Sequence, residues 1–299
     1  MDSLRSGFVA IIGRPNVGKS TLLNHLIGKK VAIMSDKPQT TRNEVLGILN
    51  RPDRQLIFID TPGVHKPKNS LGEFMMDTVR KSLRNVDVIL YLVDGTQDFG
   101  RGEEYILELL QGVKAPVILG INKIDLRPKE EILPVIAAYR ERYSFAHIIP
   151  ISALKEENFP ELEARIMEYL PEGPLYYPGD TTSNVREEEL VSEIIREKVL
   201  FLTEEEVPHS VAVVTDLIEE EEEGNLIRVY ASIYVERKSQ KGILIGRQGS
   251  MLKRIGRMAR VELERMWGMK VYLDLLIKVR EGWRKKETDL RNFGFRRED

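Results

Sequence analysis

Cysteine is missing from all 299 residues, which excludes a disulfide framework and a metal site built on thiolates. The four histidines are scattered along the chain without the spacing of metal ligands. No apolar run reaches the ~18 residues of a transmembrane helix, and the N-terminus lacks the basic and apolar regions of a secretory signal. These absences predict a cytoplasmic protein.

The composition is otherwise that of a globular protein with sizeable cores. Hydrophobic residues make up 42% and charged residues 31% of the chain, and its length exceeds one average domain, so we expect two. The net charge of −2 hides an asymmetry, because residues 236–299 carry 18 Lys and Arg against 9 Asp and Glu. This local surplus predicts a polyanionic partner for the C-terminal part, although a solvated surface without a partner has the same charge count.

The stretch from Gly13 to Ser20 has the order that a phosphate-binding loop needs, with an apolar run before it and a helical segment after it. Glycines allow successive backbone N–H groups to turn toward one anion, and the helix N-terminus adds partial positive charge. In this arrangement Lys19 reaches the β- and γ-phosphates and the Ser20 hydroxyl binds Mg²⁺. A glycine-rich turn without a ligand is the alternative. The residues predicted to bind the nucleotide phosphates here are Gly13, Arg14, Pro15, Asn16, Val17, Gly18, Lys19, Ser20 and Thr21.

A second motif follows a strand-like segment about forty residues after the P-loop lysine. An aspartate at the carboxyl end of a strand beside a P-loop is expected in the outer coordination sphere of the Mg²⁺ ion. A glycine that follows offers its N–H to the γ-phosphate, because no side chain blocks the approach. In isolation the motif is an ordinary turn sequence, and its position is what makes it informative. The predicted residues are Asp60, Thr61, Pro62, Gly63 and the adjoining Val64.

A third motif, Asn122-Lys123-Ile124-Asp125, ends an apolar strand over residues 115–121. A carboxylate with free oxygens accepts hydrogen bonds from guanine N1 and its 2-amino group, and adenine offers neither donor pattern. We assign that role to Asp125, with Asn122 tying the loop to the P-loop and the Lys123 stem lying along the base. As an isolated tetrad the motif fits a solvated turn equally well, so its order after the first two motifs carries the assignment.

Strands and helices alternate through the first half of the chain, and each motif follows the carboxyl end of a strand. Ser152, Ala153 and Leu154 come after the last strand, where a backbone N–H would meet guanine O6. This order predicts a doubly wound α/β domain over residues 1–172 with ligands along one edge of the sheet. The motifs together resemble a Ras-like GTPase domain of the translation-factor-related class.

Residues 173–186 are rich in proline and glycine and predict a semi-rigid linker to a second domain over residues 187–299. Phe293 and Phe295, near the C-terminus, are expected to cover an edge of that domain rather than to contact its polyanionic partner. The other expected elements are a helix over residues 187–202, strands over 208–218 and 226–235, an acidic turn over 219–225 and a last strand over 271–279.

Between the second and third of these strands, a Gly-x-x-Gly loop at Gly246 and Gly249 precedes a long helix. Lys253, Arg257 and Arg260 follow at i, i+4 and i+7, which places a positive stripe on one face. Glycines allow a nucleic-acid backbone close to the main chain, and the helix behind them favours phosphate. A helix-capping turn is the alternative for the loop alone. The predicted RNA-binding residues are Ile245, Gly246, Arg247, Gln248, Gly249, Ser250, Lys253, Arg254 and Arg257.

With this order of elements, the second half resembles a KH domain of the type 2 topology, with a core over about residues 204–281. A GTPase domain followed by one KH domain resembles the Era family of GTPases over essentially the whole chain, and Pro38 to Arg42 in the first switch loop resembles that family too. The resemblance implies a role in maturation of the small ribosomal subunit, with RNA held near the 3′ end of the small-subunit rRNA. It also implies peripheral association with the inner face of the membrane, and we expect a monomer.

The resemblance further implies a switch mechanism. GTP with Mg²⁺ orders the loop at Thr40 and Thr41 and the segment after Asp60, and hydrolysis releases both. Of the two threonines, the resemblance favours the second as the Mg²⁺ ligand. The predicted metal ligands are Ser20, Thr41 and Asp60, and the predicted catalytic residues are Lys19, Thr41 and Gly63.

Val64 departs from the pattern of Ras-type enzymes, which place a water-orienting glutamine directly after the glycine. Valine forms no hydrogen bond with water, so we expect slow intrinsic hydrolysis or another group that places the water. By similarity to cation-dependent relatives, Asn16 implies a monovalent cation such as K⁺ that neutralises charge in the transition state. His65 is a less favoured alternative for placing the water, since it lies on a loop expected to be exposed.

Two other classes of function stay open on the sequence. An RNA-modifying enzyme powered by GTP would need catalytic residues in the second half, where no histidine pair or cofactor motif is found. A static RNA-binding adaptor would have a vestigial nucleotide site, and the intact residues Lys19, Ser20, Asp60 and Asp125 argue against that. A GTP-driven RNA-binding assembly factor is therefore the leading hypothesis.

Overall fold

The computed structural model describes residues 4–221 and 225–295. The chain divides into two compact units, the first made of residues up to 67 with 75–184, and the second of residues 68–74 with 185 onward. Each unit is described by itself. The predicted acidic turn at residues 219–225 and the last residues of the chain, 296–299, lie partly or wholly outside the described residues.

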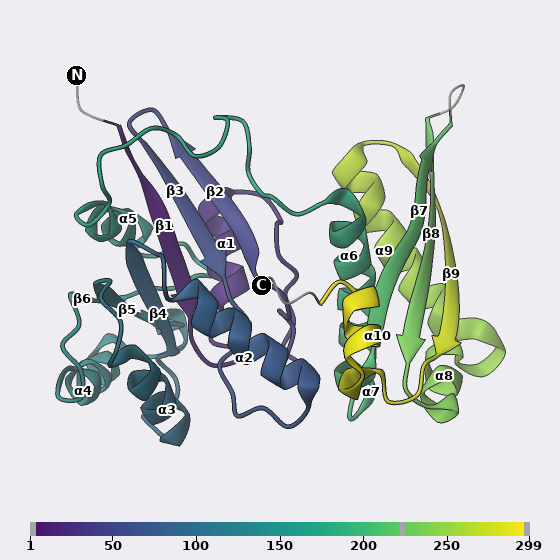
Figure 1. Cartoon of the computed structure of the whole chain (residues 1–299), viewed down its shortest axis with the longest axis horizontal. Helices are drawn as coiled ribbons and strands as arrows, with labels where there is room; N and C mark the ends of the chain where they lie inside the picture. The colour runs from purple at the N-terminus through teal and green to yellow at the C-terminus, as the bar shows by residue number, and fades with distance from the viewer. Residues whose placement is uncertain (1–3, 222–224, 296–299) are drawn as a thin grey trace. The chain divides into compact units, whose positions relative to one another are not determined.

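The first unit is built on a six-stranded sheet with the strand order β2-β3-β1-β4-β5-β6 (Figure 1). β2 runs antiparallel to β3, whereas the remaining neighbours are parallel. All seven residues of β4 are buried, as expected for a central strand covered on both faces. The strands are β1 Arg5–Ile12, β2 Val45–Arg51, β3 Arg54–Asp60, β4 Val88–Asp94, β5 Val117–Asn122 and β6 His147–Pro150.

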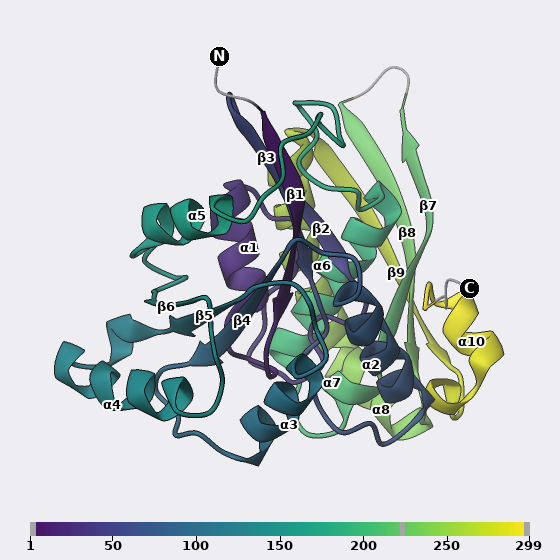
Figure 2. The same ribbon diagram turned by 60° about the vertical axis from the view of Figure 1, so that its left-hand side comes forward.

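Two layers of helices cover the two faces of this sheet (Figures 1 and 2). Val9 and Ile11 of β1 face a core shared with α1 and α5, whereas Ala10 and Ile12 face a core shared with α2, α3 and α4. This alternation follows from the two-residue repeat of a strand. The predicted doubly wound α/β fold is confirmed. The helices are α1 Lys19–Ile27, α2 Ser70–Ser82, α3 Arg101–Leu110, α4 Lys129–Arg140 and α5 Phe159–Met167, with a 3₁₀ turn, η1, over Ile124–Leu126.

The second unit is a three-stranded sheet with helices on it. In Figure 2, β7 and β8 form a hairpin with β9 beside β8, and β9 runs parallel to β8. Helices α6 and α9 contact each other, and both contact the sheet. The elements are α6 Glu187–Leu202, α7 Val207–Ser210, β7 Ala212–Glu220, β8 Leu226–Val235, α8 Lys238–Ile245, η2 Arg247–Gly249, α9 Ser250–Trp267, β9 Lys270–Val279, η3 Trp283–Lys285 and α10 Glu287–Asn292.

One strand prediction in this unit was wrong at its start. The strand expected from Pro208 begins at Ala212, because residues 207–210 form the short helix α7. Proline suits the first turn of a helix, since its φ is already helical and the missing N–H has no partner there in any case.

The aromatic residues of the C-terminal segment belong to the core of the second unit. Trp283 is fully buried and donates its indole N–H to the carbonyl of Ser210 at 2.9 Å. Phe295, which is 8% exposed, stacks on Trp283 with ring centroids 6.1 Å apart, and Phe293 lies 4.6 Å from the ring of Tyr234. The expectation that both phenylalanines cover an edge agrees with these contacts, and they leave neither ring free to stack on a base.

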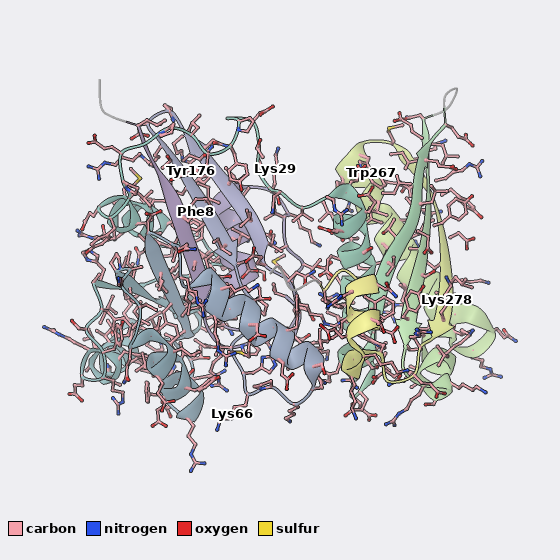
Figure 3. All side chains as sticks on the ribbon, viewed as in Figure 1. Phe8, Lys29, Lys66, Tyr176, Trp267 and Lys278 are labelled. Atoms are coloured by element: carbon pink, nitrogen blue, oxygen red, sulfur yellow. The ribbon has the colours of Figure 1, made fainter. Side chains whose placement is uncertain are left out.

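The segment expected to be a semi-rigid spacer is fixed along the sheet of the first unit. The Ile48 N–H donates to Thr182 O at 2.9 Å, and Asn50 Nδ2 donates to Thr181 O at 2.8 Å. Buried Gln55 accepts hydrogen bonds from the backbone N–H groups of Tyr176 and Tyr177 at 2.9 and 3.0 Å. The Tyr176 ring meets Phe8 of β1 edge-on at 4.9 Å (Figure 3). This stretch therefore extends the sheet beside β2.

Candidate functional site

The phosphate loop lies between β1 and α1, at the carboxyl edge of the sheet. Gly18, at φ 102°, is the N-cap of α1, and Asn16 has φ 66°, so both residues of the loop take up a left-handed backbone conformation. With this conformation the loop lines a pocket of about 240 Å³. Its lining residues are Pro15, Asn16, Gly18, Lys19, Ser20, Thr21, Ile33, Met34, Ser35, Asp36, Gln39, Thr40, Thr41, Gly63 and Lys123.

Lys19 lies at the base of this pocket and is 6% exposed. Its Nζ donates to the carbonyls of Gly13 at 3.3 Å and Arg14 at 3.1 Å. Burial lowers the pKa of Lys19 to about 8, and the nearby carboxylate of Asp60 opposes that shift. A phosphate in the pocket would stabilise the charged ammonium, so the site is electrostatically prepared for an anion.

Three oxygen-bearing side chains meet beside Lys19. The Ser20 hydroxyl lies 2.7 Å from Asp60 Oδ2 and 2.9 Å from Thr41 Oγ1, and Thr41 Oγ1 lies 3.4 Å from the same carboxylate oxygen. Asp60 Oδ1 is buried without a hydrogen-bond partner, and burial raises the pKa of Asp60, with Lys19 opposing. Thr40 points elsewhere, since its hydroxyl donates to Lys37 O at 2.6 Å. Two hydroxyls and a carboxylate with an unpaired oxygen fit a hard divalent cation such as Mg²⁺.

The segment after Asp60 lies directly on the P-loop. A Cβ at Gly63 would lie 2.8 Å from Pro15 N, so only glycine allows this approach. The Val64 N–H donates to Gly13 O at 3.0 Å, and the Val64 side chain is 4% exposed within the core on the α2–α4 side. A buried valine places no polar atom near the phosphates, which agrees with the departure noted in the sequence.

The third motif is tied to the P-loop as predicted. Asn122 Nδ2 donates to Val17 O at 2.7 Å, and Asn122 Oδ1 accepts from the Ala153 N–H at 2.8 Å. Asp125 Oδ1 accepts a hydrogen bond from Ser152 Oγ at 2.6 Å. The Ser152–Leu154 segment after β6 therefore also orients the carboxylate that is predicted to bind guanine. Leu154 is 61% exposed beside this loop.

Asp94 is a residue that sequence reasoning missed. Lys123 has φ 67°, and its Nζ lies 2.6 Å from Asp94 Oδ2, so the ammonium is anchored at the end of β4 while the stem stays free. The sequence shows only that an aspartate ends this apolar strand, and the sheet then places that strand beside β1. Several residues predicted to bind the nucleotide have side chains elsewhere: those of Val17, Val64 and Ala153 are in the core, and the Arg14 guanidinium lies on Glu103.

The second unit carries a groove of about 520 Å³ between α9 and β9. Gly249 stands at its end, and Lys253, Arg257 and Arg260 line one wall, which is the predicted positive stripe. The opposite wall is formed by residues 271–275 of β9, which were predicted as part of a strand but not as RNA-binding residues. Arg260 was in the stripe but not among the predicted RNA-binding residues, and it lines the same groove as Lys253 and Arg257.

The Gly-x-x-Gly loop has the backbone that its glycines suggest. Gly246 has φ 69°, and a Cβ there would lie 2.8 Å from Met251 N, whereas Gly249 has φ 77° and open space around it. Arg247 and Gln248 are exposed at the tip of the loop. The remaining predicted residues flank the groove without lining it: Ile245, Ser250 and Arg254.

Comparisons with known proteins agree with both halves. A family model described as 50S ribosome-binding GTPase matches residues 8–123, and a KH domain model matches residues 206–284. GTPase Era from Heliobacterium modesticaldum is 52% identical over 295 residues, which is 99% of this chain and 98% of the relative. The chain belongs to the Era family of GTPases. Family membership makes it a GTP-hydrolysing enzyme with a C-terminal KH domain.

Two solved Era structures are similar over the whole chain. One is a variant of Aquifex aeolicus Era bound to GDP and AlF₄⁻, and the other is Era in complex with MgGDPNP and nucleotides 1506–1542 of 16S ribosomal RNA. Each has a TM-score of 0.94 and 43% identity, covering 98% of this chain and 99% of the other. Within residues 4–221 and 225–295, no helix of this Era-family chain combines the length and the apolarity needed to cross a membrane.

Proposed function

We propose that this chain is a GTP-dependent switch that binds single-stranded RNA near the 3′ end of small-subunit rRNA and assists assembly of the small ribosomal subunit. The observation that carries the proposal is the presence, in one chain, of the prepared phosphate pocket around Lys19 and the basic groove along Lys253 and Arg257. The Era relative bound to MgGDPNP and nucleotides of 16S ribosomal RNA supports the pairing of these two ligands.

In this proposal, the pocket residues divide the work on GTP and Mg²⁺. Lys19 binds the β- and γ-phosphates, and the Gly63 N–H meets the γ-phosphate. Asp125 selects guanine through its carboxylate. Ser20, Thr41 and Asp60 would together hold Mg²⁺. The distances of 2.7 to 3.4 Å among these three oxygen-bearing side chains support the metal assignment, and when bound the ion neutralises charge on the phosphates.

The switch would act through Thr41 and the Gly63 segment. Both contact the γ-phosphate side of the site, so loss of that phosphate releases both. β2 begins at Val45, shortly after Thr41, and its far edge carries the segment that leads to the KH domain. Ordering of the first switch loop would therefore change the conformation of that segment where it leaves β2. In this way it would change the affinity of the KH domain for RNA.

Slow intrinsic hydrolysis follows from the buried Val64. We infer that a monovalent cation near Asn16 supplies part of the missing charge compensation. Asn16 Nδ2 donates to Asp36 O at 2.5 Å, so Asn16 already joins the P-loop to the first switch loop. GTP turnover measured in K⁺ and in Na⁺ at equal ionic strength tests this, and equal rates would count against the cation.

We also infer the domain limits and the state of the molecule. The GTPase domain is taken as residues 1–172, the linker as 173–186, and the KH domain as 187–299 with its core at about 204–281. We infer a monomer in the cytoplasm with peripheral membrane association, for which the basic stretches of the sequence are the support. Flotation with anionic and with neutral vesicles tests the membrane part, and a lack of difference between them would oppose it.

One experiment separates the proposed function from its alternatives. GTP turnover is measured with and without an oligonucleotide of the small-subunit rRNA 3′ end, and the RNA is examined for chemical change. Stimulated hydrolysis with unmodified RNA supports the assembly switch. Modified RNA would indicate an RNA-modifying enzyme, and tight GTP binding without turnover in any cation would indicate a static adaptor.

A further inference from the structure

The P-loop residue Arg14 places its side chain on helix α3 instead of in the phosphate pocket. Its Nη1 lies 3.3 Å from Glu103 Oε2 and 3.4 Å from Oε1. The Glu103 side chain is 6% exposed, whereas that of Arg14 is 41% exposed. A carboxylate buried this deeply needs a cation, and in the described part of the chain Arg14 is the one at ion-pair distance.

Gly102 makes room for this ion pair. A Cβ at Gly102 would lie 2.6 Å from Arg14 Nε and 3.0 Å from Cζ, so the guanidinium crosses the first turn of α3 where a side chain would otherwise be. The Gly102 backbone is helical, so the conformation itself accepts alanine. A side chain at Gly102 would therefore displace the Arg14 guanidinium and would not meet the backbone of another element.

The pair fixes the part of the P-loop on which the catalytic groups rest. Lys19 Nζ donates to the Arg14 carbonyl at 3.1 Å, and the Val64 N–H donates to the carbonyl of the preceding residue, Gly13, at 3.0 Å. The backbone at residues 13–15 is thus the common support of the phosphate-binding lysine and of the segment after Asp60. The Arg14 guanidinium on Glu103 anchors this backbone to α3.

We propose that Arg14 and Glu103 form a positioning pair for GTP hydrolysis. The pair holds the P-loop against α3 so that Lys19 and the Gly63 N–H meet the γ-phosphate together, and neither member touches the phosphate. Small errors in such placement cost far more in turnover than in ground-state binding. The inference rests on the proposed role of Lys19, which is tested separately by nucleotide affinity in Lys19→Ala.

Gly102→Ala is the sharpest test, because it displaces the guanidinium without removing either charge. If the pair only stabilises the fold, displacing the guanidinium should lower the Tm, because Glu103 is then buried without its partner, and kcat should stay unchanged. The positioning role predicts a kcat about tenfold lower, with GDP affinity within about threefold of the original. Glu103→Gln should show the same loss of kcat and the same nearly unchanged GDP affinity as Gly102→Ala. Glu104→Gln is the matched control, since it removes an exposed carboxylate from the same helical turn and should keep the original kcat.

The double variant Arg14→Met/Glu103→Met distinguishes positioning from stability. Removing both partners leaves no buried unpaired charge, so its Tm should lie near that of the original chain while kcat stays low. Recovery of kcat together with Tm would overturn the proposal, as would an unchanged kcat in Gly102→Ala or an equal loss in Glu104→Gln. Unchanged GTP affinity in Lys19→Ala would contradict the proposed role of Lys19. An unchanged kcat in Gly102→Ala would contradict only the positioning role of Arg14 and Glu103.

Discussion

Asn122 and Val17 are joined by a hydrogen bond of 2.7 Å from the asparagine side chain to the valine carbonyl, across 105 positions of sequence. The bond links the loop proposed to read the base with the loop proposed to hold the phosphates. A Cβ at Gly18 would lie 2.3 Å from Asn122 Nδ2, so the glycine is required for the bond to form. The distance between the two ends of a bound nucleotide is thereby set by the protein before the ligand arrives.

Replacing Asn122 with alanine should weaken binding of GTP and GDP alike. The change leaves the Val17 carbonyl and the Ala153 N–H without their partner, at about 1–3 kcal/mol for each buried group. We expect affinity for both nucleotides to fall by at least about tenfold in equilibrium titration. Asn225→Ala, in the hairpin of the second unit, is the control. A loss confined to GTP would contradict a role in fixing the site itself.

Asp125→Asn should change which base is accepted. The amide presents a donor where guanine needs an acceptor, and xanthine supplies the complementary pattern. We expect GTP affinity to fall by about 100-fold or more and xanthosine triphosphate affinity to rise, measured by competition against a labelled nucleotide. Because Ser152 Oγ donates to Asp125 Oδ1 at 2.6 Å, Ser152→Ala should weaken GTP binding by a smaller factor without changing the base preference. An undiminished preference for GTP in Asp125→Asn would refute the assignment.

The buried Lys19 predicts two pH effects of opposite sign. Its pKa is about 8 in the folded, ligand-free protein, against the ordinary lysine value of 10.5 that applies to the unfolded chain. Between these values the unfolded chain holds the proton that the folded chain has lost, so the contribution of Lys19 to stability rises with pH. Phosphate binding needs the charged ammonium, so GTP affinity should fall above pH 8.

Urea unfolding of the ligand-free protein at pH 7.5, 9 and 10.5 tests the first effect. The comparison variant is Lys19→Met, which keeps the apolar stem and has no proton to exchange. The difference in unfolding free energy between the two proteins should change with pH in this window. Parallel curves would show that Lys19 keeps an ordinary pKa, and the carboxylate of Asp60 would then dominate its surroundings.

Gly249→Asp should weaken RNA binding and spare GTP binding. Gly249 has φ 77° with no atom within 4 Å of the place a Cβ would take, so aspartate has room there at the cost of backbone strain, and its carboxylate faces the phosphates expected in the groove. We expect RNA affinity to fall by about tenfold, and to fall more at low salt. Gly282→Asp is a matched control, because Gly282 has φ 66° and open space but lies outside the groove. Equal effects of the two variants would contradict the RNA-binding role of the loop.

The sequence was sufficient where one local pattern determines one local structure. The P-loop, the Asn122 motif and α6 were located from residue order, because each depends on neighbouring residues and on strand or helix periodicity. Thr41 was favoured over Thr40 as the Mg²⁺ ligand by resemblance alone, and that assignment stays a prediction. In the structure the Thr40 hydroxyl donates to Lys37 O.

The residues missed are those whose role comes from contacts far apart in the sequence. In the sequence, Asp94 looks like an ordinary residue at the end of a strand and Glu103 like an ordinary glutamate in the first turn of a helix. Acidic residues are common at both kinds of position. Only the fold brings Lys123 to one and Arg14 to the other. The attachment of residues 176–184 to β2 and β3 was missed for the same reason. Prolines and glycines indicate a break in regular structure and do not indicate what the chain then contacts.

The attachment of this segment to the sheet determines where the chain can be shortened without exposing unpaired backbone groups of the GTPase domain. A shortened chain ending at residue 172 would leave the Ile48 N–H and the buried amide of Gln55 without the backbone that satisfies them. An open strand edge of this kind recruits strands from other molecules and leads to aggregation. A chain ending after Asn184 keeps the edge occupied, so the smallest piece expected to stay monodisperse while turning over GTP includes the whole segment along β2.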